Sequence, residues 1–231
     1  MLLYTYLLIF ISLFIIYIFN KNIEIYNFGK RHKKSINILI IGGTHGDEPS
    51  STLSLYKLIT YLKNKKIYNG FITIIPKLNK FGYYVNDRYT YHFFKKYDIN
   101  RCYPNKFYIN KIVTKLIPKY DFIIDHHEGY HYHKTVKESI GSSVSLENYE
   151  KLTNKKIKKI LNKLNKSIPE KKEFVFNKKK YIPDHSLRDF IDKKYPKKKY
   201  ILLETTGKFN KEPIRKRTFK SLYIILSLLR N

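Results

Sequence analysis

The chain has 231 residues, with 46 Lys and Arg against 18 Asp and Glu, and a formal charge of +28. This length predicts a single domain with one core once an apolar N-terminal stretch is set aside. The single cysteine, Cys102, excludes an internal disulfide and any Cys-x-x-Cys zinc or redox motif. The positive charge could attract nucleic acid, anionic lipid or an acidic substrate. Because the cations are not grouped on one element and no RNA-binding motif is present, we do not expect nucleic acid as a partner. The sequence indicates no obligate protein partner.

The N-terminal residues 2–19 contain no charged side chain. At about 1.5 Å per residue, such a run can cross or nearly cross a bilayer of about 30 Å. It lacks the basic start and the small-residue cleavage site of a signal peptide. We therefore expect residues 1–20 to be an uncleaved membrane anchor, residues 21–35 a basic linker, and residues 36–231 the functional domain. Because the basic residues follow the run, the positive-inside bias predicts that this domain is cytoplasmic.

Strands and helices are expected to alternate beyond residue 36. Residues 36–41 are a β-branched and leucine run that ends in two glycines, as a buried parallel strand does. A helix capped by Asp47 or Ser50 should follow, because apolar residues recur there at three and four positions up to Leu62. Further strands are predicted at 70–76, 120–125 and 200–204, and further helices at 107–117, 146–168, 186–195 and 214–229. The pattern predicts an α/β three-layer sandwich with a mostly parallel central sheet.

Polar residues suited to metal binding follow two of these strands, at the sheet edge where ligands collect in such folds. His45 and Glu48 lie three residues apart in a glycine-rich turn, so both can reach one metal ion. A chance histidine beside a helix-capping acid would explain this pair equally well. The strand at 120–125 leads into a second imidazole, in the segment Asp125-His126-His127-Glu128. Two histidines and one glutamate form a catalytic zinc set that leaves one position open for water.

Three further charged residues are candidates for the same edge. Glu204 follows an apolar run, and a carboxylate buried there is unfavourable unless it has a task or a partner, such as one of the many lysines. Arg88 and Arg101 lie in a long segment without helical or strand periodicity, and such segments are often functional. Arginine can grip a carboxylate through two parallel hydrogen bonds, so both are candidate substrate clamps. The alternative is that both are ordinary surface cations.

The order of these motifs resembles the zinc carboxypeptidase superfamily. The short spacing between the motifs is closer to the succinylglutamate desuccinylase and aspartoacylase branch than to a full-length digestive carboxypeptidase. The resemblance runs from about Ile36 to the end of the chain. It rests on HGDE (His45, Glu48), Asn79-x-x-Gly82, Arg88, DINR (98–101), DHHE (125–128) and LLET with Glu204.

The resemblance implies a zinc-dependent hydrolase that cleaves an amide or peptide bond beside a substrate carboxylate. Its substrate would be a carboxylate-bearing peptide or an N-acyl amino acid, as for a carboxypeptidase or a deacylase. By resemblance, one Zn²⁺ ion would be held by His45, Glu48 and His127, and Asp125 would orient a ligand histidine. Glu204 would act as general base and proton shuttle, and Arg88 would stabilise the oxyanion. Asn100 and Arg101 would bind the substrate carboxylate.

Some features depart from the family pattern. His126 stands where the family has an apolar residue, so a shift of one residue would exchange His126 with His127 as ligand. Strand alternation allows only one of the two to face the metal. His131 and His133 could bind a second metal or lie in an exposed loop. We do not expect a counterpart of the C-terminal β domain of aspartoacylases in this sequence. The competing hypothesis is a catalytically inactive, basic, membrane-tethered binding protein that keeps the fold.

Overall fold

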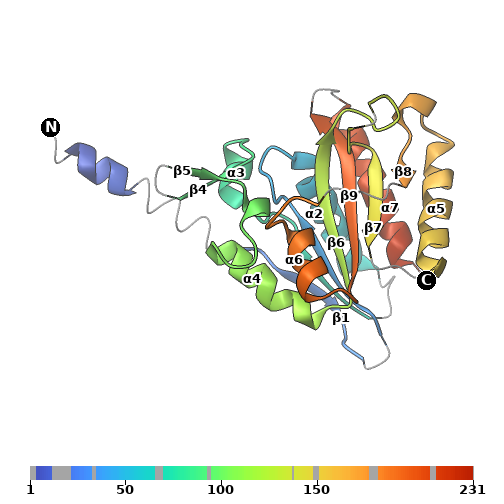
Figure 1. The fold of residues 1–231 in the computed structure, drawn as a ribbon, viewed down its shortest axis with the longest axis horizontal. Helices are drawn as coiled ribbons and strands as arrows, with labels where there is room; N and C mark the ends of the chain where they lie inside the picture. The colour runs from blue at the N-terminus through green and yellow to red at the C-terminus, as the bar shows by residue number, and fades with distance from the viewer. Residues whose placement is uncertain are drawn as a thin grey trace.

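The computed structural model describes residues 4–11, 22–32, 35–65, 70–92, 95–136, 138–147, 151–176, 182–208 and 212–230. Figure 1 shows the chain as a central sheet flanked by helices. The strands are β1 (Tyr26–Gly29), β2 (Asn37–Gly42), β3 (Phe71–Ile75), β4 (Thr90–His92), β5 (Lys95–Tyr97), β6 (Phe122–Tyr130), β7 (Ser143–Glu147), β8 (Val175–Phe176) and β9 (Lys199–Lys208). The α-helices are α2 (Pro49–Asn64), α3 (Lys80–Tyr84), α4 (Tyr108–Leu116), α5 (Lys151–Asn165), α6 (Leu187–Lys194) and α7 (Ile214–Leu229), and short 3-10 turns occur at η1 (Ile99–Arg101), η2 (Ile117–Lys119) and η3 (Glu170–Lys172).

The central sheet has seven strands in the order β1-β3-β2-β6-β9-β7-β8. The strands β3, β2, β6 and β9 run parallel to one another, and β8 runs parallel to β7. In this sheet β1 pairs antiparallel with β3, and β7 pairs antiparallel with β9. Because parallel neighbours end at the same edge, the carboxyl ends of β2, β6 and β9 lie side by side. The predicted mostly parallel sheet is confirmed.

Helices cover both faces of this sheet, which confirms the predicted three-layer architecture. Successive residues of β2 face opposite sides, as the period of a strand requires. Ile38 and Ile40 join a core formed with α2, α5 and α7. Leu39 and Ile41 join a second core formed with α4 and α6. In Figure 1 α4 and α6 lie on the near side of the sheet.

The helix predicted at 146–168 is wrong at its start. Leu146 lies in β7, opposite Ile201 of β9, and the helix begins only at Lys151. Val144 and Leu146 are both buried, with Ser145 between them on the other face of the strand. Leu146 also fits the apolar spacing of the following helix. The local sequence around Leu146 therefore fits either a strand or the start of the helix. Pairing with β9 makes it a strand.

The predicted cap of α2 is also wrong. Neither Asp47 nor Ser50 caps the helix; Glu48 is the N-cap residue, and its side chain makes no capping hydrogen bond. Pro49 occupies the first helical position, where the missing N–H of proline leaves no donor unsatisfied. The Glu48 carboxylate instead points toward His45 and His127.

The N-terminal region falls partly outside the described residues. Residues 4–11 are helical, and Tyr26–Gly29 of the predicted linker form the edge strand β1. Across the described ranges, we find no helix with the length and apolar character needed to span a bilayer. The predicted anchor at 1–20 lies mostly outside those ranges, so it stays a prediction.

We predict that the two faces of α2 contribute unequally to stability. Leu58 is fully buried, whereas the adjacent Lys57 is exposed. Leu58→Ala should lower the free energy of unfolding by about 2–5 kcal/mol, because it removes buried methyl groups and leaves a cavity. Lys57→Ala should change it by less than about 0.5 kcal/mol. Urea denaturation of both variants measures the difference, and equal losses would contradict the packing of α2.

Candidate metal centre and catalytic pocket

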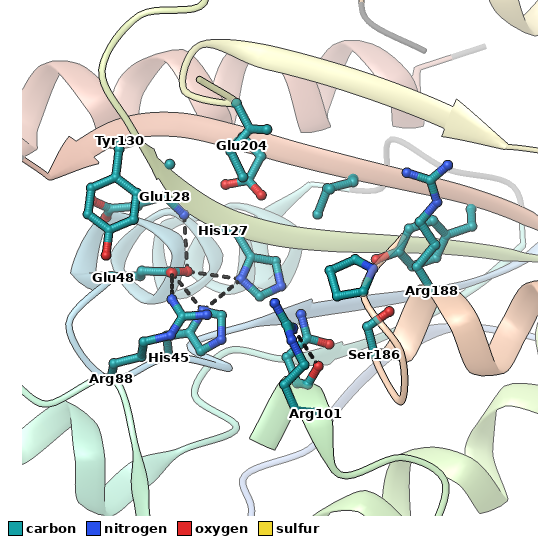
Figure 2. Close-up of a pocket in the computed structure, with 16 residues that line it drawn as sticks. His45, Glu48, Arg88, Arg101, His127, Glu128, Tyr130, Ser186, Arg188 and Glu204 are labelled. Carbon is teal, nitrogen blue, oxygen red and sulfur yellow. Dashed lines mark hydrogen bonds and ion pairs between the residues drawn. The ribbon is translucent and has the colours of Figure 1, made fainter. Parts of the chain in front are cut away.

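The predicted site residues come together at the carboxyl edge of the parallel strands. His45 and Glu48 follow β2, His127 lies on β6, and Glu204 lies opposite it on β9 in the sheet register. β6 and β9 extend beyond the predicted ends, so His127 and Glu204 are held by strand hydrogen bonds rather than by loops. Figure 2 shows the Glu204 carboxylate directed toward His127 and Glu48.

The turn after β2 depends on two glycines, Gly43 and Gly46. Gly43 has a φ of +62°, a conformation that favours glycine. A Cβ added at Gly46 would overlap the carbonyl group of Gly82. Gly82 is itself held by Asn79, whose Oδ1 accepts a hydrogen bond from the Gly82 N–H at 3.0 Å. The Asn79-x-x-Gly82 motif therefore forms the wall against which the His45 turn packs.

His45, Glu48 and His127 form a compact cluster that could hold a metal ion. Their ligand atoms all lie within 4.8 Å of one another. Glu48 Oε1 is 2.6 Å from His45 Nδ1, and Glu48 Oε2 is 2.9 Å from His127 Nδ1. Each residue is at most 3% exposed. Two imidazole nitrogens and one carboxylate match the donor set of catalytic zinc sites, so the residues fit the implied ion.

Carboxylates on the far side of each ring orient the two imidazoles. His127 Nε2 lies 3.1 Å from Asp125 Oδ1, and His45 Nε2 lies 3.1 Å from Asp98 Oδ1. The Tyr200 hydroxyl in turn donates to Asp125 at 2.7 Å. Such partners fix which nitrogen of each ring faces the metal position. The side-chain role of Asp98 toward His45 could not be inferred from the DINR motif alone.

The carboxylates of Glu48 and Asp125 favour a positive charge at the cluster. Burial raises the pKa of Glu48, but His45 and His127 together lower it by more than burial raises it. The pKa of Glu48 therefore lies well below its usual range. Burial lowers the pKa of His127, yet Asp125 and Glu48 raise it well above its ordinary value. A site that stabilises a positive charge in this way is suited to binding a cation.

Strand alternation separates His126 from His127. His126 Nδ1 lies 3.1 Å from Ser54 Oγ of α2, on the opposite face of the sheet from the cluster. Burial and the charge of His127 lower the pKa of His126 to about 3, so its ring is neutral. Only His127 faces His45 and Glu48. Within the described residues, His131 and His133 join no metal-binding group, and His133 Nδ1 lies 2.6 Å from the Ser139 carbonyl oxygen.

The cluster borders a cavity of about 220 Å³. Its walls include all seven predicted catalytic, substrate-binding and metal-binding residues, together with several that sequence reasoning missed. Figure 2 shows Tyr130 near Glu48 and Arg88, with Arg101, Ser186 and Arg188 toward the other end. The lining residues are His45, Glu48, Arg88, Asn100, Arg101, His127, Glu128, Gly129, Tyr130, Ile140, Pro183, Ser186, Arg188, Tyr200, Leu202 and Glu204.

The predicted arginines take different positions around this cavity. The Arg88 guanidinium donates to Asp98 Oδ2 at 2.8 Å and lies 3.5 Å from Glu48, so it is fixed beside the cluster. Burial lowers the pKa of Arg88, but Asp98 and Glu48 together raise it by more than burial lowers it. The guanidinium therefore stays charged. Arg101 is exposed, and its Nη1 donates to the Asn100 carbonyl oxygen at 2.7 Å. Asn100 Oδ1 accepts from Leu187 N at 2.9 Å, which ties the DINR segment to α6.

Arg188 is the functional candidate that the sequence analysis missed. It is 4% exposed and lies in the first turn of α6, among the buried residues Leu187, Phe190 and Ile191. Arginine is almost never fully buried unless it is paired. Its place on the apolar face of a predicted helix was therefore a signal that could have identified it.

Comparison with known proteins gives the same fold and a matching family signature. Residues 34–143 match the family model of the succinylglutamate desuccinylase/aspartoacylase catalytic domain. No curated protein sequence matches the chain. Tripeptide-bound Cell Shape Determinant Csd4 from Helicobacter pylori superposes with a TM-score of 0.71 at 19% identity, over 90% of this chain and 55% of that one. The chain thus spans about half the length of Csd4.

Other solved structures share the fold. A candidate metallopeptidase from Shewanella denitrificans has a TM-score of 0.63 at 16% identity, covering 89% of this chain and 78% of its own. An aspartoacylase family protein from Mesorhizobium loti has a TM-score of 0.57 at 19% identity, covering 90% and 62%. The resemblance predicted from the motifs is confirmed: the chain has the fold of the zinc carboxypeptidase superfamily and, over residues 34–143, the signature of its succinylglutamate desuccinylase/aspartoacylase branch.

Proposed function

We propose that the chain is a zinc-dependent hydrolase that cleaves an amide or peptide bond beside a substrate carboxylate. The observation that carries this proposal is the buried cluster of His45, Glu48 and His127 at the wall of a cavity that Glu204 also lines. An inactive binding protein that keeps the fold would require no such set, because a scaffold gains nothing from burying two imidazoles around a carboxylate.

A zinc ion bound by this cluster would polarise the scissile carbonyl and lower the pKa of water. The chain's own residues supply the remaining chemistry. Glu204 faces the cluster, so its carboxylate can accept a proton from the attacking water and pass it to the leaving nitrogen. Arg88 is held beside Glu48 by Asp98, where its positive charge can stabilise the oxyanion of the tetrahedral intermediate.

The substrate carboxylate is proposed to bind Asn100 and Arg101, and Arg188 lines the same cavity. Two comparisons support this substrate class. Csd4, a D,L-carboxypeptidase, has been crystallised with a tripeptide and with mDAP. An aspartoacylase family protein shares the fold. We therefore propose a carboxylate-bearing peptide or an N-acyl amino acid as the substrate.

Removal of His127 should abolish metal binding and hydrolysis together. His127→Ala should weaken zinc binding by more than the roughly 10- to 100-fold that loss of an outer partner causes, because a direct ligand is lost. His126→Asn is the matched control, since His126 faces Ser54 on the opposite side of the strand. Elemental analysis of the purified proteins measures this. Full zinc content in His127→Ala, or none in the wild-type chain, would contradict the proposal.

Removal of the Glu204 carboxylate should separate catalysis from metal binding. Glu204→Gln should lower kcat by about 10²- to 10⁴-fold, because the amide cannot accept the proton of water. Its zinc content should stay at the wild-type level, since Glu204 is not among the three clustered ligands. A screen of peptides and N-acyl amino acids identifies the substrate, and kcat and bound zinc are then measured for both proteins. Unchanged kcat would exclude Glu204 as the base.

Arg101 should act on substrate affinity in a way that depends on the substrate carboxylate. A charged hydrogen bond contributes about 1.5–3 kcal/mol, so Arg101→Ala should raise KM by roughly 10- to 150-fold. Arg101→Lys should lose part of this effect, because lysine keeps the charge but not the paired donors. The control is the same substrate with its carboxylate converted to an amide, on which wild type and variant should have similar KM values. Equal losses on both substrates would argue against a carboxylate clamp.

A further inference from the structure

Glu128 is a buried carboxylate beside the metal cluster that the proposed mechanism does not use. It follows His127 directly on β6 and is 3% exposed. A buried carboxylate is unfavourable unless it is paired and hydrogen-bonded. Figure 2 shows Glu128 beside Glu48 at one end of the cluster.

The Glu128 side chain joins the two helices on the far face of the sheet. One carboxylate oxygen accepts a hydrogen bond from the backbone N–H of Ser50, in the first turn of α2. The other forms an ion pair with Arg217 of α7. Arg217 is held in turn, because its Nε donates to the Glu212 carbonyl oxygen at 2.8 Å. The first turn of α2 also favours an anion there, through its free N–H groups.

The neighbouring strand makes room for this carboxylate. A Cβ added at Gly207 of β9 would overlap Glu128 Oε2. Any other residue at this position would therefore displace the carboxylate from its partners. The glycine that follows Glu204 and two threonines is thus explained by Glu128, and not by the chemistry of Glu204.

Both connections of Glu128 lead to proposed metal ligands. Its backbone N–H donates to Glu48 Oε2 at 3.1 Å, the oxygen that also lies 2.9 Å from His127 Nδ1. Its side chain holds Ser50, two residues after Glu48, through the hydrogen bond to α2. A shift of Glu128 would therefore move the Glu48 carboxylate and the backbone that carries His127.

We propose that Glu128, paired with Arg217, is a positioning residue that fixes the Glu48 carboxylate and His127 in the geometry required for metal binding. This inference rests on the proposed zinc function. It assigns α7 a role in the site, although α7 contributes no ligand: its Arg217 holds the Glu128 carboxylate in place through their ion pair.

The chain offers a matched control in a second buried ion pair on the same helix. Glu212 and Lys220 lie 2.7 Å apart, with side chains that are 6% and 9% exposed. Among the contacts of the described residues, neither side chain reaches His45, Glu48 or His127. Substitution of Glu212 therefore leaves a buried cation without its partner, as substitution of Glu128 does. It keeps the backbone carbonyl that holds Arg217 and removes no side-chain contact to the proposed ligands.

The test is zinc affinity, measured by competition with a chelator on the full chain. Glu128→Ala should weaken zinc binding by about 10- to 100-fold, the usual effect of losing an outer partner. Glu128→Gln should lose less, because its amide oxygen can still accept from Ser50. Glu212→Ala and Glu212→Gln should keep zinc affinity within about twofold of wild type, even if they unfold at lower urea concentration. The visible spectrum of the cobalt(II)-loaded protein should change in Glu128→Ala and not in Glu212→Ala.

The inference is overturned if Glu128→Ala binds zinc as tightly as wild type, or loses no more affinity than Glu212→Ala. If Glu128→Ala does not fold, the comparison of Glu128→Gln with Glu212→Gln decides in the same way. A wild-type chain that binds no zinc would instead overturn the proposed function. The two failures are therefore distinguishable.

Discussion

The site depends on one buried carboxylate that two imidazoles share. Glu48 is 2% exposed, and burial of an ion of this size costs several kcal/mol even after relaxation. His45 and His127 on its two oxygens, together with the N–H of Glu128, offset that cost. Because all three groups aim at one carboxylate, a shift of any one of them leaves part of its charge without a partner. The same convergence leaves a position suited to a divalent cation.

Sheet topology explains why this convergence could be predicted from the sequence. The strands β2, β6 and β9 each contain a continuous apolar run, at 38–41, 122–124 and 200–203, that is buried on both faces. Such runs predict parallel strands without knowledge of their partners. Parallel neighbours share one carboxyl edge, so residues that follow or end these strands must meet there. His45, Glu48, His127 and Glu204 satisfy this condition. The choice between His126 and His127 required the structure, since one residue of register exchanges the two faces.

Features that depend on tertiary pairing could not be predicted in the same way. The strand β7 carries serines that alternate with apolar residues, and its last apolar residue also fits the helix that follows. Asp98 and Arg188 reach the site because η1 and α6 pack against the sheet. The helical periodicity of α6 marks Arg188 as buried, but it does not show which side chains Arg188 faces. Glu128 was visible in the DHHE motif, but its partners Ser50 and Arg217 come from distant helices. Local sequence patterns specify the ligands here, whereas long-range packing specifies the residues that hold them.

The size of the cavity bears on the kind of substrate that the site can select. At about 220 Å³ it is smaller than the roughly 300–1,000 Å³ typical of pockets that enclose a drug-sized ligand. It can therefore surround one end group of a substrate, while the remainder lies outside. Arg88, Arg101 and Arg188 line this cavity, so charge rather than shape would select that end group. A peptide with a free carboxyl terminus and an N-acyl amino acid present the same carboxylate-bearing group beside an amide bond. Under the proposed function, one such cavity could thus accept either substrate.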